Sequence, residues 1–406
     1  MRQAYRIISV YTGDLSGACS ALYELGGMVV MHDPSGCNST YNTHDEIRWY
    51  DRDSLIYISG LNNIDAIMGN DDKLIEDITA AARQTGPRFL ALANSPVPFL
   101  NGTDFEGIAR VLEKETGIPA FYVPTNGMHD YVRGGGLAFH KLAEKMLAGK
   151  NRGSKTRGPY KGGILRVNVL GMTPLDFAAP SSRQSLKKIL EEAGMEMVSC
   201  WAMGDTLDDL LKAPEAHVSL VISSLGLKAA AYLKKHCGIP MVDGLPADGI
   251  RDQVLEDLRL SASDFLDRYP CRDLRDRVKE GKRAALIGEA VTMGSLAASL
   301  EKICGIRTRL VCPTEDCESF LAPGDLVTRG EEEVEKALQG EEIVIADPLY
   351  RPILPEGAAL IPLPHLAFSG RIFLKDIPDL FSDLKDIVPA LTGSAQPGKG
   401  DANGNE

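Results

Sequence analysis

Short apolar runs alternate with amphipathic stretches along most of the chain. The first run, residues 28–31, lies between Gly26-Gly27 and Asp33-Pro34. It is too short for a helix and is bounded by turn-forming residues, so we expect a buried strand. Similar runs at 55–59, 88–94 and 120–124 are separated by stretches with helical spacing, including 71–78 and 104–116. The first third is therefore predicted to alternate strands with helices.

The same alternation restarts at residue 164, after a linker rich in Gly, Lys and Arg, and again at residue 283. Three restarts predict an α/β fold with three Rossmann-like doubly wound parallel-sheet subdomains. We expect their bounds at 1–150, 160–280 and 281–392, followed by a disordered tail at 393–406. Gly134-Gly135-Gly136 is predicted to form a turn before a helix at 137–147. Ligands in such folds bind at the carboxyl ends of the strands.

Two cysteines stand at element ends in the first subdomain. Cys37 follows the first strand, on the loop where a parallel sheet places its ligands. Cys19 precedes the amphipathic segment 20–25 and is predicted to begin a helix, where backbone N–H groups favour a thiolate. Two such thiolates are suited to a soft metal or an iron–sulfur cluster. Buried structural thiols are an equally simple interpretation of the same two residues.

Composition narrows the class of protein. The chain has 406 residues and a net charge of −12, which argues against a nucleic-acid or anionic-membrane surface. It has no run of eighteen apolar residues and no signal-peptide pattern at its N-terminus, so we expect a cytoplasmic protein whose eight cysteines are thiols or ligands. No GxGxxG or Walker A motif follows a strand, so a nucleotide site is not supported. Cys312 and Cys317 form a weaker candidate metal pair.

Residues 32–37, His-Asp-Pro-Ser-Gly-Cys, resemble the His-Gly-Pro-x-Gly-Cys signature of the nitrogenase component 1 family, with Asp33 in place of glycine. This family includes nitrogenase subunits, their cofactor scaffold, dark-operative protochlorophyllide reductase and the reductase of coenzyme F430 synthesis. Residues 67–74 resemble its Val-Phe-Gly-Gly-Glu-x-Lys-Leu segment, and 204–207 resemble its Gly-Asp-Gly-Thr-Leu segment. Residues 95–104 resemble the segment that carries the third cluster cysteine, with Ser95 at the cysteine position.

The resemblance implies that Cys19 and Cys37 ligate an iron–sulfur cluster at a subunit interface. Asp33 and Ser95 are then candidate cofactor-binding residues that could offer oxygen ligands. A [4Fe–4S] cluster usually takes four protein ligands, and one chain offers two thiols at these positions. A homodimer supplies both cysteines twice and completes the set. A heterodimer with a paralogous subunit is the other option.

The same resemblance implies a two-component reductase. A separate ATP-dependent iron–sulfur reductase would deliver electrons to this component, which would reduce a small organic, tetrapyrrole-like substrate. Ser223 and Ser224 stand where the family's nitrogen-fixing members anchor their cofactor through cysteine, so nitrogen fixation is not expected. His365 is the expected proton donor. A cluster or cofactor scaffold without turnover, or a metal-free small-ligand binding protein, would fit the same fold.

Overall fold

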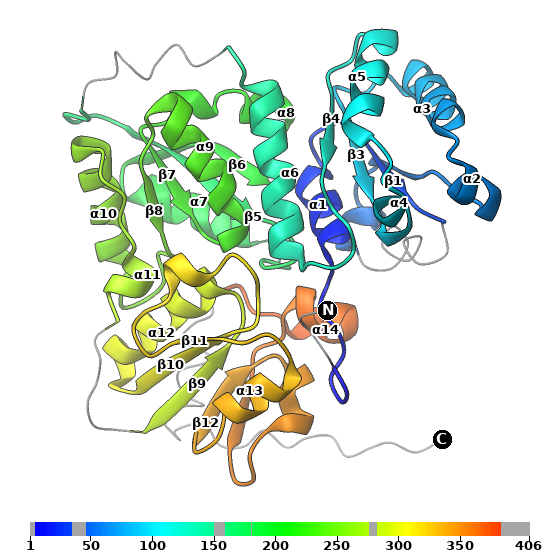
Figure 1. Cartoon of the computed structure of the whole chain (residues 1–406). Helices are drawn as coiled ribbons and strands as arrows, with labels where there is room; N and C mark the ends of the chain where they lie inside the picture. Colours follow the sequence, from blue (N-terminus) through cyan, green and yellow to red (C-terminus); the bar gives the residue numbers. More distant parts are fainter. Residues whose placement is uncertain (1–4, 35–45, 150–158, 180, 276–281, 383–406) are drawn as a thin grey trace.

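Three parallel β-sheets, each covered by helices, form the chain (Figure 1). The computed structural model describes residues 5–34, 46–149, 159–179, 181–275 and 282–382. The strand orders are β2-β1-β3-β4, β6-β5-β7-β8 and β11-β10-β9-β12-β13. Within the described ranges every pairing between these strands is parallel. The prediction of three Rossmann-like doubly wound subdomains is confirmed.

Both faces of the first sheet are buried. Successive side chains of a strand point to opposite faces, so a strand such as β1 contributes to two separate cores. Val29 and Met31 of β1 belong to the large core that includes α1 and α6, whereas Met28 and Val30 pack with α3 and α5. The elements of this part are β1 (Met28–His32), β2 (Leu55–Ile58), β3 (Leu90–Asn94), β4 (Ala120–Val123), α1 (Asp14–Leu22), α2 (Asn63–Met68), α3 (Asp71–Thr85), α4 (Pro96–Asn101), α5 (Phe105–Thr116) and α6 (Tyr131–Met146).

The second and third sheets repeat the pattern. The second comprises β5 (Leu165–Met172), β6 (Met195–Ala202), β7 (Val218–Val221) and β8 (Met241–Asp243), with α7 (Ser182–Glu192), α8 (Leu207–Leu210), α9 (Leu227–Cys237), α10 (Arg251–Asp264) and α11 (Pro270–Asp273). The third comprises β9 (Arg283–Ile287), β10 (Arg307–Cys312), β11 (Leu326–Val327), β12 (Ile343–Ala346) and β13 (Ala359–Pro362), with α12 (Ala290–Cys304), α13 (Glu331–Ala337) and α14 (Leu366–Ser369).

The N-terminal segment joins the third sheet to the first. Ile8 and Tyr11 lie in a core cluster with strands β9 and β12, and the Glu331 carboxylate accepts the Ile8 N–H at 3.0 Å. The Thr12 N–H then donates to the carbonyl of Ala367 in α14. Figure 1 shows this segment beside α14 before it enters α1.

Two local predictions are wrong. The first helix begins at Asp14, so Cys19 lies well inside α1 and not at its N-terminus. Gly134, Gly135 and Gly136 lie within α6 and form no turn. A Cβ on Gly134 would stand 1.9 Å from the Asp14 carbonyl oxygen, and one on Gly135 would stand 2.5 Å from Leu225. The glycines are needed because α1 and the segment at Leu225 both pack closely against α6.

Three predictions concern residues that the structure does not describe. They are the predictions for Cys37, for most of the linker and for the tail at 393–406. The segment after β3, expected as a loop, forms helix α4, with Ser95 at its N-cap and Pro96 at its first position. No helix of the described ranges combines the length and apolar character that a membrane span requires.

Candidate functional site

Two of the predicted cofactor-binding residues stand side by side where β1 and β3 end. Asp33 follows β1 and Ser95 follows β3, and the Ser95 N–H donates to the His32 carbonyl at 3.3 Å. Both side chains are buried. The Ser95 hydroxyl has no hydrogen-bond partner in the part of the chain that the structure describes. This hydroxyl is therefore available to a further group, as are several other buried hydroxyls of the described ranges, including that of Ser219.

Cys19 is fully buried in α1, which packs against β1 and β3. Burial raises the pKa of its thiol far above the usual range, and the nearby Glu46 carboxylate adds to the effect. The predicted helix-start activation of a Cys19 thiolate is therefore wrong. A raised pKa does not exclude Cys19 as a ligand, because a metal ion would remove the proton from a thiol that coordinates it.

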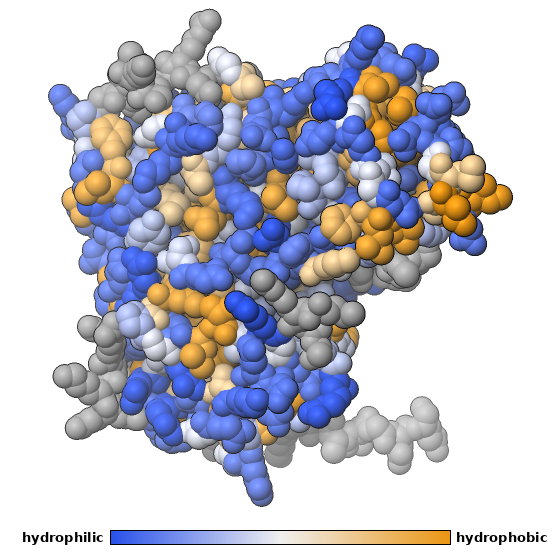
Figure 2. Space-filling view, in the orientation of Figure 1, coloured by the Kyte–Doolittle hydropathy of each residue, from blue (hydrophilic) through white to orange (hydrophobic). Residues whose placement is uncertain are grey.

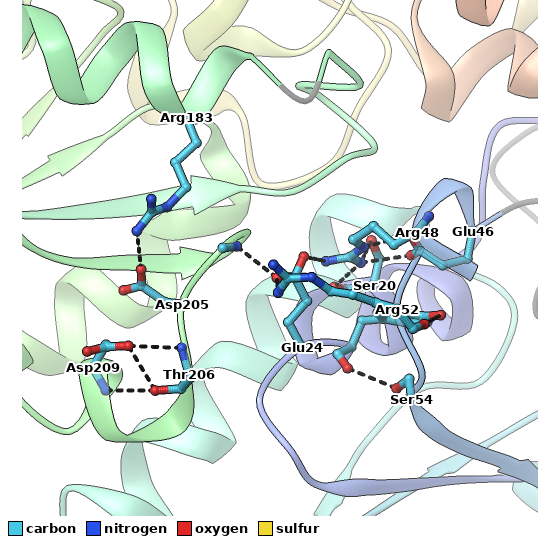
Figure 3. A network of polar contacts seen from close by, with 12 residues as sticks. Ser20, Glu24, Glu46, Arg48, Arg52, Ser54, Arg183, Asp205, Thr206 and Asp209 are labelled. Carbon is cyan, nitrogen blue, oxygen red and sulfur yellow. Dashed lines mark hydrogen bonds and ion pairs between the residues drawn. The ribbon is translucent and has the colours of Figure 1, made fainter. Parts of the chain in front are cut away.

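Glu46 and Arg48 lie at the start of the described range 46–149. A buried ion-pair network holds these two residues in place (Figure 3). Arg48 donates to both oxygens of Glu46, at 2.7 and 2.8 Å, and to the carbonyl of Ser20 at 2.9 Å. It also reaches Glu24 at 3.1 Å. Since Ser20 is adjacent to Cys19, the network attaches Glu46 and Arg48 to the helix that carries Cys19.

The described residues supply only part of a ligand set for an iron–sulfur cluster. They contain no group of three or more His, Cys, Asp or Glu residues arranged for a metal ion. Cys37, the second predicted ligand, lies outside them. Cys19 and the unpartnered Ser95 hydroxyl are the two described features that suit such a group. Cys312 and Cys317 are both buried, and the Cys312 sulfur contacts the Thr314 hydroxyl at 3.3 Å.

His365 lies in a buried polar cluster to which all three sheets contribute. Its Nε2 is 3.1 Å from Oδ1 of Asp176, which follows β5. The same carboxylate accepts the hydroxyl of Tyr131 from α6 and the hydroxyl of Ser223 after β7, each at 2.6 Å. Burial raises the pKa of Tyr131 well above its usual value, with Asp176 contributing. Tyr131 and Ser223 are therefore hydroxyl donors that stabilise the Asp176 carboxylate.

A second carboxylate completes this cluster. Glu289 follows β9, and its side chain accepts the Ser224 N–H at 2.8 Å, the Ser224 hydroxyl, and the N–H groups of Val291 and Thr292 at the start of α12. Burial and the neighbouring Asp176 raise its pKa. Ser223 and Ser224, which replace the expected cysteine anchor, thus each donate to one of two buried carboxylates.

Sequence reasoning missed Tyr131, Asp176 and Glu289. Asp176 and Glu289 follow strands at their carboxyl ends, which was a usable signal because parallel sheets place functional groups there. Their meeting point depends on how three sheets pack, which local patterns do not encode.

A cavity of about 230 Å³ is lined by Glu46, Leu175 and Leu366, among others. Glu46 is close enough to Cys19 to raise the pKa of its thiol. Leu175 and Leu366 are the sequence neighbours of Asp176 and His365, which do not line the cavity themselves.

Comparison with known proteins places these features in context. The sequence profile of the family described as nitrogenase component 1 type oxidoreductase matches residues 14–258. A light-independent protochlorophyllide reductase polypeptide of Prosthecochloris aestuarii is 30% identical over 146 residues, which cover 35% of this chain and 27% of that protein. The nitrogenase molybdenum-iron protein alpha chain of Azospirillum brasilense is 25% identical over 230 residues, covering 53% of this chain and 45% of that protein.

The matched segments thus span less than half of these relatives' lengths. A solved structure titled nitrogenase Cp1 at pH 5 superposes with a TM-score of 0.63 at 14% identity, covering 98% of this chain and 92% of that chain. At this level of identity the likeness shows the shared fold.

Proposed function

The chain belongs to the nitrogenase component 1 type oxidoreductase family, and from this we propose that it is the catalytic component of a two-component reductase. A separate ATP-dependent iron–sulfur reductase would supply single electrons, and this chain would use them to reduce an organic substrate. The observation that carries the proposal is the cavity between Glu46, beside Cys19, and the residues adjoining Asp176 and His365. We also propose that the protein works in the cytoplasm, where thiols stay reduced.

We propose that Cys19 and Cys37 hold a [4Fe–4S] cluster, with Ser95 and Asp33 beside it. When bound, such a cluster supplies one-electron transfer. The Ser95 hydroxyl supports this assignment, because it is buried and unpartnered within the described ranges at the family's third cysteine position. The Arg48 network supports it as well, since it holds Glu46 and Arg48 against α1, next to Cys19.

Two thiols per chain call for a second copy or a paralogue, and we propose a homodimer, with a heterodimer of paralogues as the alternative. Large apolar side chains gather on α2 and α4, where Ile64, Ile67, Met68 and Leu100 are 72–82% exposed. Figure 2 shows this apolar surface. Exposed apolar patches of this kind mark interaction surfaces. Helix α4 begins directly after Ser95, so a partner bound there would be close to the proposed cluster site.

The buried cluster around Asp176 would hold the proton for the reaction. Nε2 of His365 lies 3.1 Å from Oδ1 of Asp176, a close contact that does not have hydrogen-bond geometry in the described residues. Tyr131 and Ser223 keep that carboxylate in place through their hydroxyls. Apolar lining residues such as Leu175 and Leu366 would exclude water from the substrate.

Cavity size limits the substrate. About 230 Å³ is below the roughly 300–1,000 Å³ of sites for drug-sized ligands. It would accept one or two rings of a tetrapyrrole, with the rest of the macrocycle outside. Tetrapyrroles are therefore the first substrate class to test, through binding of a single reducible ring.

The test is iron and sulfide analysis with EPR of the anaerobically reconstituted, dithionite-reduced protein. We expect about four irons per dimer, lost in both Cys19→Ala and Cys37→Ala. Cys237→Ala is the matched control, because Cys237 is also a buried helical thiol but lies in α9 of the second subdomain. Iron that is absent, or that is equally retained in all three variants, would overturn the proposed cluster.

A further inference from the structure

A second cavity lies on the face of the first sheet opposite α1. Its volume is about 170 Å³. Met28 and Val30 of β1 form one wall, and Leu74, Ile78 and Ala81 of α3 form the other. Residues 28 and 30 point away from the Cys19 side of the sheet. The apolar part of this cavity therefore lies on the other face of the sheet from Cys19, whereas its residues His32 and Ser59 adjoin Asp33.

The deep end of this cavity carries a hydrogen-bond donor. His32 lines it at the carboxyl end of β1, and its Nδ1 is 2.8 Å from the Ser59 hydroxyl oxygen. That oxygen also accepts the Asp33 N–H at 3.2 Å. When the Ser59 hydroxyl donates to Nδ1, the ring proton is on Nε2.

The rim is polar and its lysine is already paired. Lys73 lies 2.9 Å from Asp65, and the Asn70 amide donates to the same carboxylate at 3.0 Å. An anionic ligand would have to displace the Asp65 carboxylate from this lysine. The interior, in contrast, is walled by aliphatic side chains. The combination favours an uncharged ligand.

We propose that this cavity binds a neutral, ring-sized organic molecule whose carbonyl oxygen accepts the His32 Nε2–H. The volume suits one ring, since a cavity of about 150 Å³ accommodates benzene. One end of the cavity, at His32 and Ser59, lies where β1 and β2 end, and parallel sheets place ligands at such ends. Asn70, Lys73 and Leu74 of the 67–74 motif would thereby contribute to binding, as parts of the rim and wall.

The experiment is ligand-observed NMR on the full chain, with acetophenone and toluene as probes of equal ring size. We expect both to bind and acetophenone to bind about fivefold more tightly, the value of one hydrogen bond. Ala81→Leu fills the cavity and should abolish binding of both probes. Ala80→Leu, on the exposed side of α3, is the matched control and should leave binding unchanged.

His32→Leu removes the hydrogen-bond donor and leaves the apolar walls of the cavity unchanged. It should remove the preference for acetophenone while toluene still binds, which also shows that the variant is folded. Failure of acetophenone to bind the unmodified chain would overturn the inference. So would equal effects of Ala81→Leu and Ala80→Leu. Neither result would bear on iron content, so the proposed cluster is tested separately.

Discussion

Asp176 shows how a single buried charge is stabilised in this protein. Its carboxylate is fully buried, and the two hydroxyls of Tyr131 and Ser223 donate to it at 2.6 Å. Hydroxyl donors replace the water that the charge loses on folding.

Ser223→Ala should therefore lower the free energy of unfolding by about 1–3 kcal/mol, because it leaves part of a buried carboxylate unsatisfied. The control is Ser219→Ala in β7. Ser219 is equally buried, but its hydroxyl has no hydrogen-bond partner within the described ranges, so its loss should cost much less. Urea unfolding of both variants gives the comparison, and equal losses would contradict the role given to Ser223.

Asp130, at the N-cap of α6, makes stability depend on pH. Burial raises its pKa from 3.8 to about 7. The folded protein then holds a proton that the unfolded chain releases, so stability should fall as pH rises from about 4 to about 7.

Asp130→Asn should flatten this slope in urea unfolding between pH 4 and 7, because asparagine does not titrate; its single side-chain oxygen keeps the cap to the Arg133 N–H but loses the contact with the Glu315 N–H. Asp104→Asn is the control, since Asp104 caps α5 in the same way but is exposed. An unchanged slope in Asp130→Asn would contradict the assignment.

At the scale of elements, the contact between α1 and α6 decides the geometry of the first subdomain. Gly17 and Gly134 let the two backbones approach so closely that a Cβ on either would overlap the other helix, at 2.3 and 1.9 Å. Glycine inside a helix costs about 1 kcal/mol relative to alanine, and the packing offsets this cost.

Gly134→Ala should lower the free energy of unfolding by about 1–3 kcal/mol or more, since backbone atoms must move apart. Gly136→Ala is the matched control in the same helix. There the nearest atom to an added Cβ is the Leu225 carbonyl at 3.3 Å, so the helix-propensity gain should roughly offset the crowding. Thermal unfolding measures both, and a larger loss in Gly136→Ala would contradict this account.

The same contact explains where sequence reasoning succeeded and where it failed. Strands such as β1 were predictable because an apolar run between turn residues is a local signal. The start of helix α1 was predicted at Cys19 instead of Asp14. Glycine is usually unfavourable inside a helix, whereas close packing against α6 requires glycine at position 17. Motifs pointed to Cys19, Asp33 and Ser95, whose roles remain predictions. The cluster around Asp176 was missed because its members come from three subdomains, including Tyr131 from helix α6.

At the scale of the whole molecule, Glu24 links the first subdomain to the second. Besides its two arginines, Glu24 accepts the Gly204 N–H at 2.9 Å (Figure 3). Gly204 precedes Asp205, which holds Arg183 and the Cys200 N–H. The 204–207 motif is thus a structural contact between subdomains.

Arg48→Met should cost about 3–5 kcal/mol, because it removes the buried cation between Glu24 and Glu46. Arg52→Met is the control. Arg52 contacts the same Glu24, but its side chain is 54% exposed, so we expect a cost of about 1 kcal/mol or less. Similar costs in urea unfolding would contradict the importance given to burial.

Helix α6 lies between the first two sheets and packs against α1 on one side and α9 on the other (Figure 1). If α6 lost its contact with either sheet, the apolar core of that sheet would become exposed to water. The two subdomains should therefore melt together in one calorimetric transition. For the proposed reduction, such cooperativity would also remove partly open states through which solvent could reach the substrate.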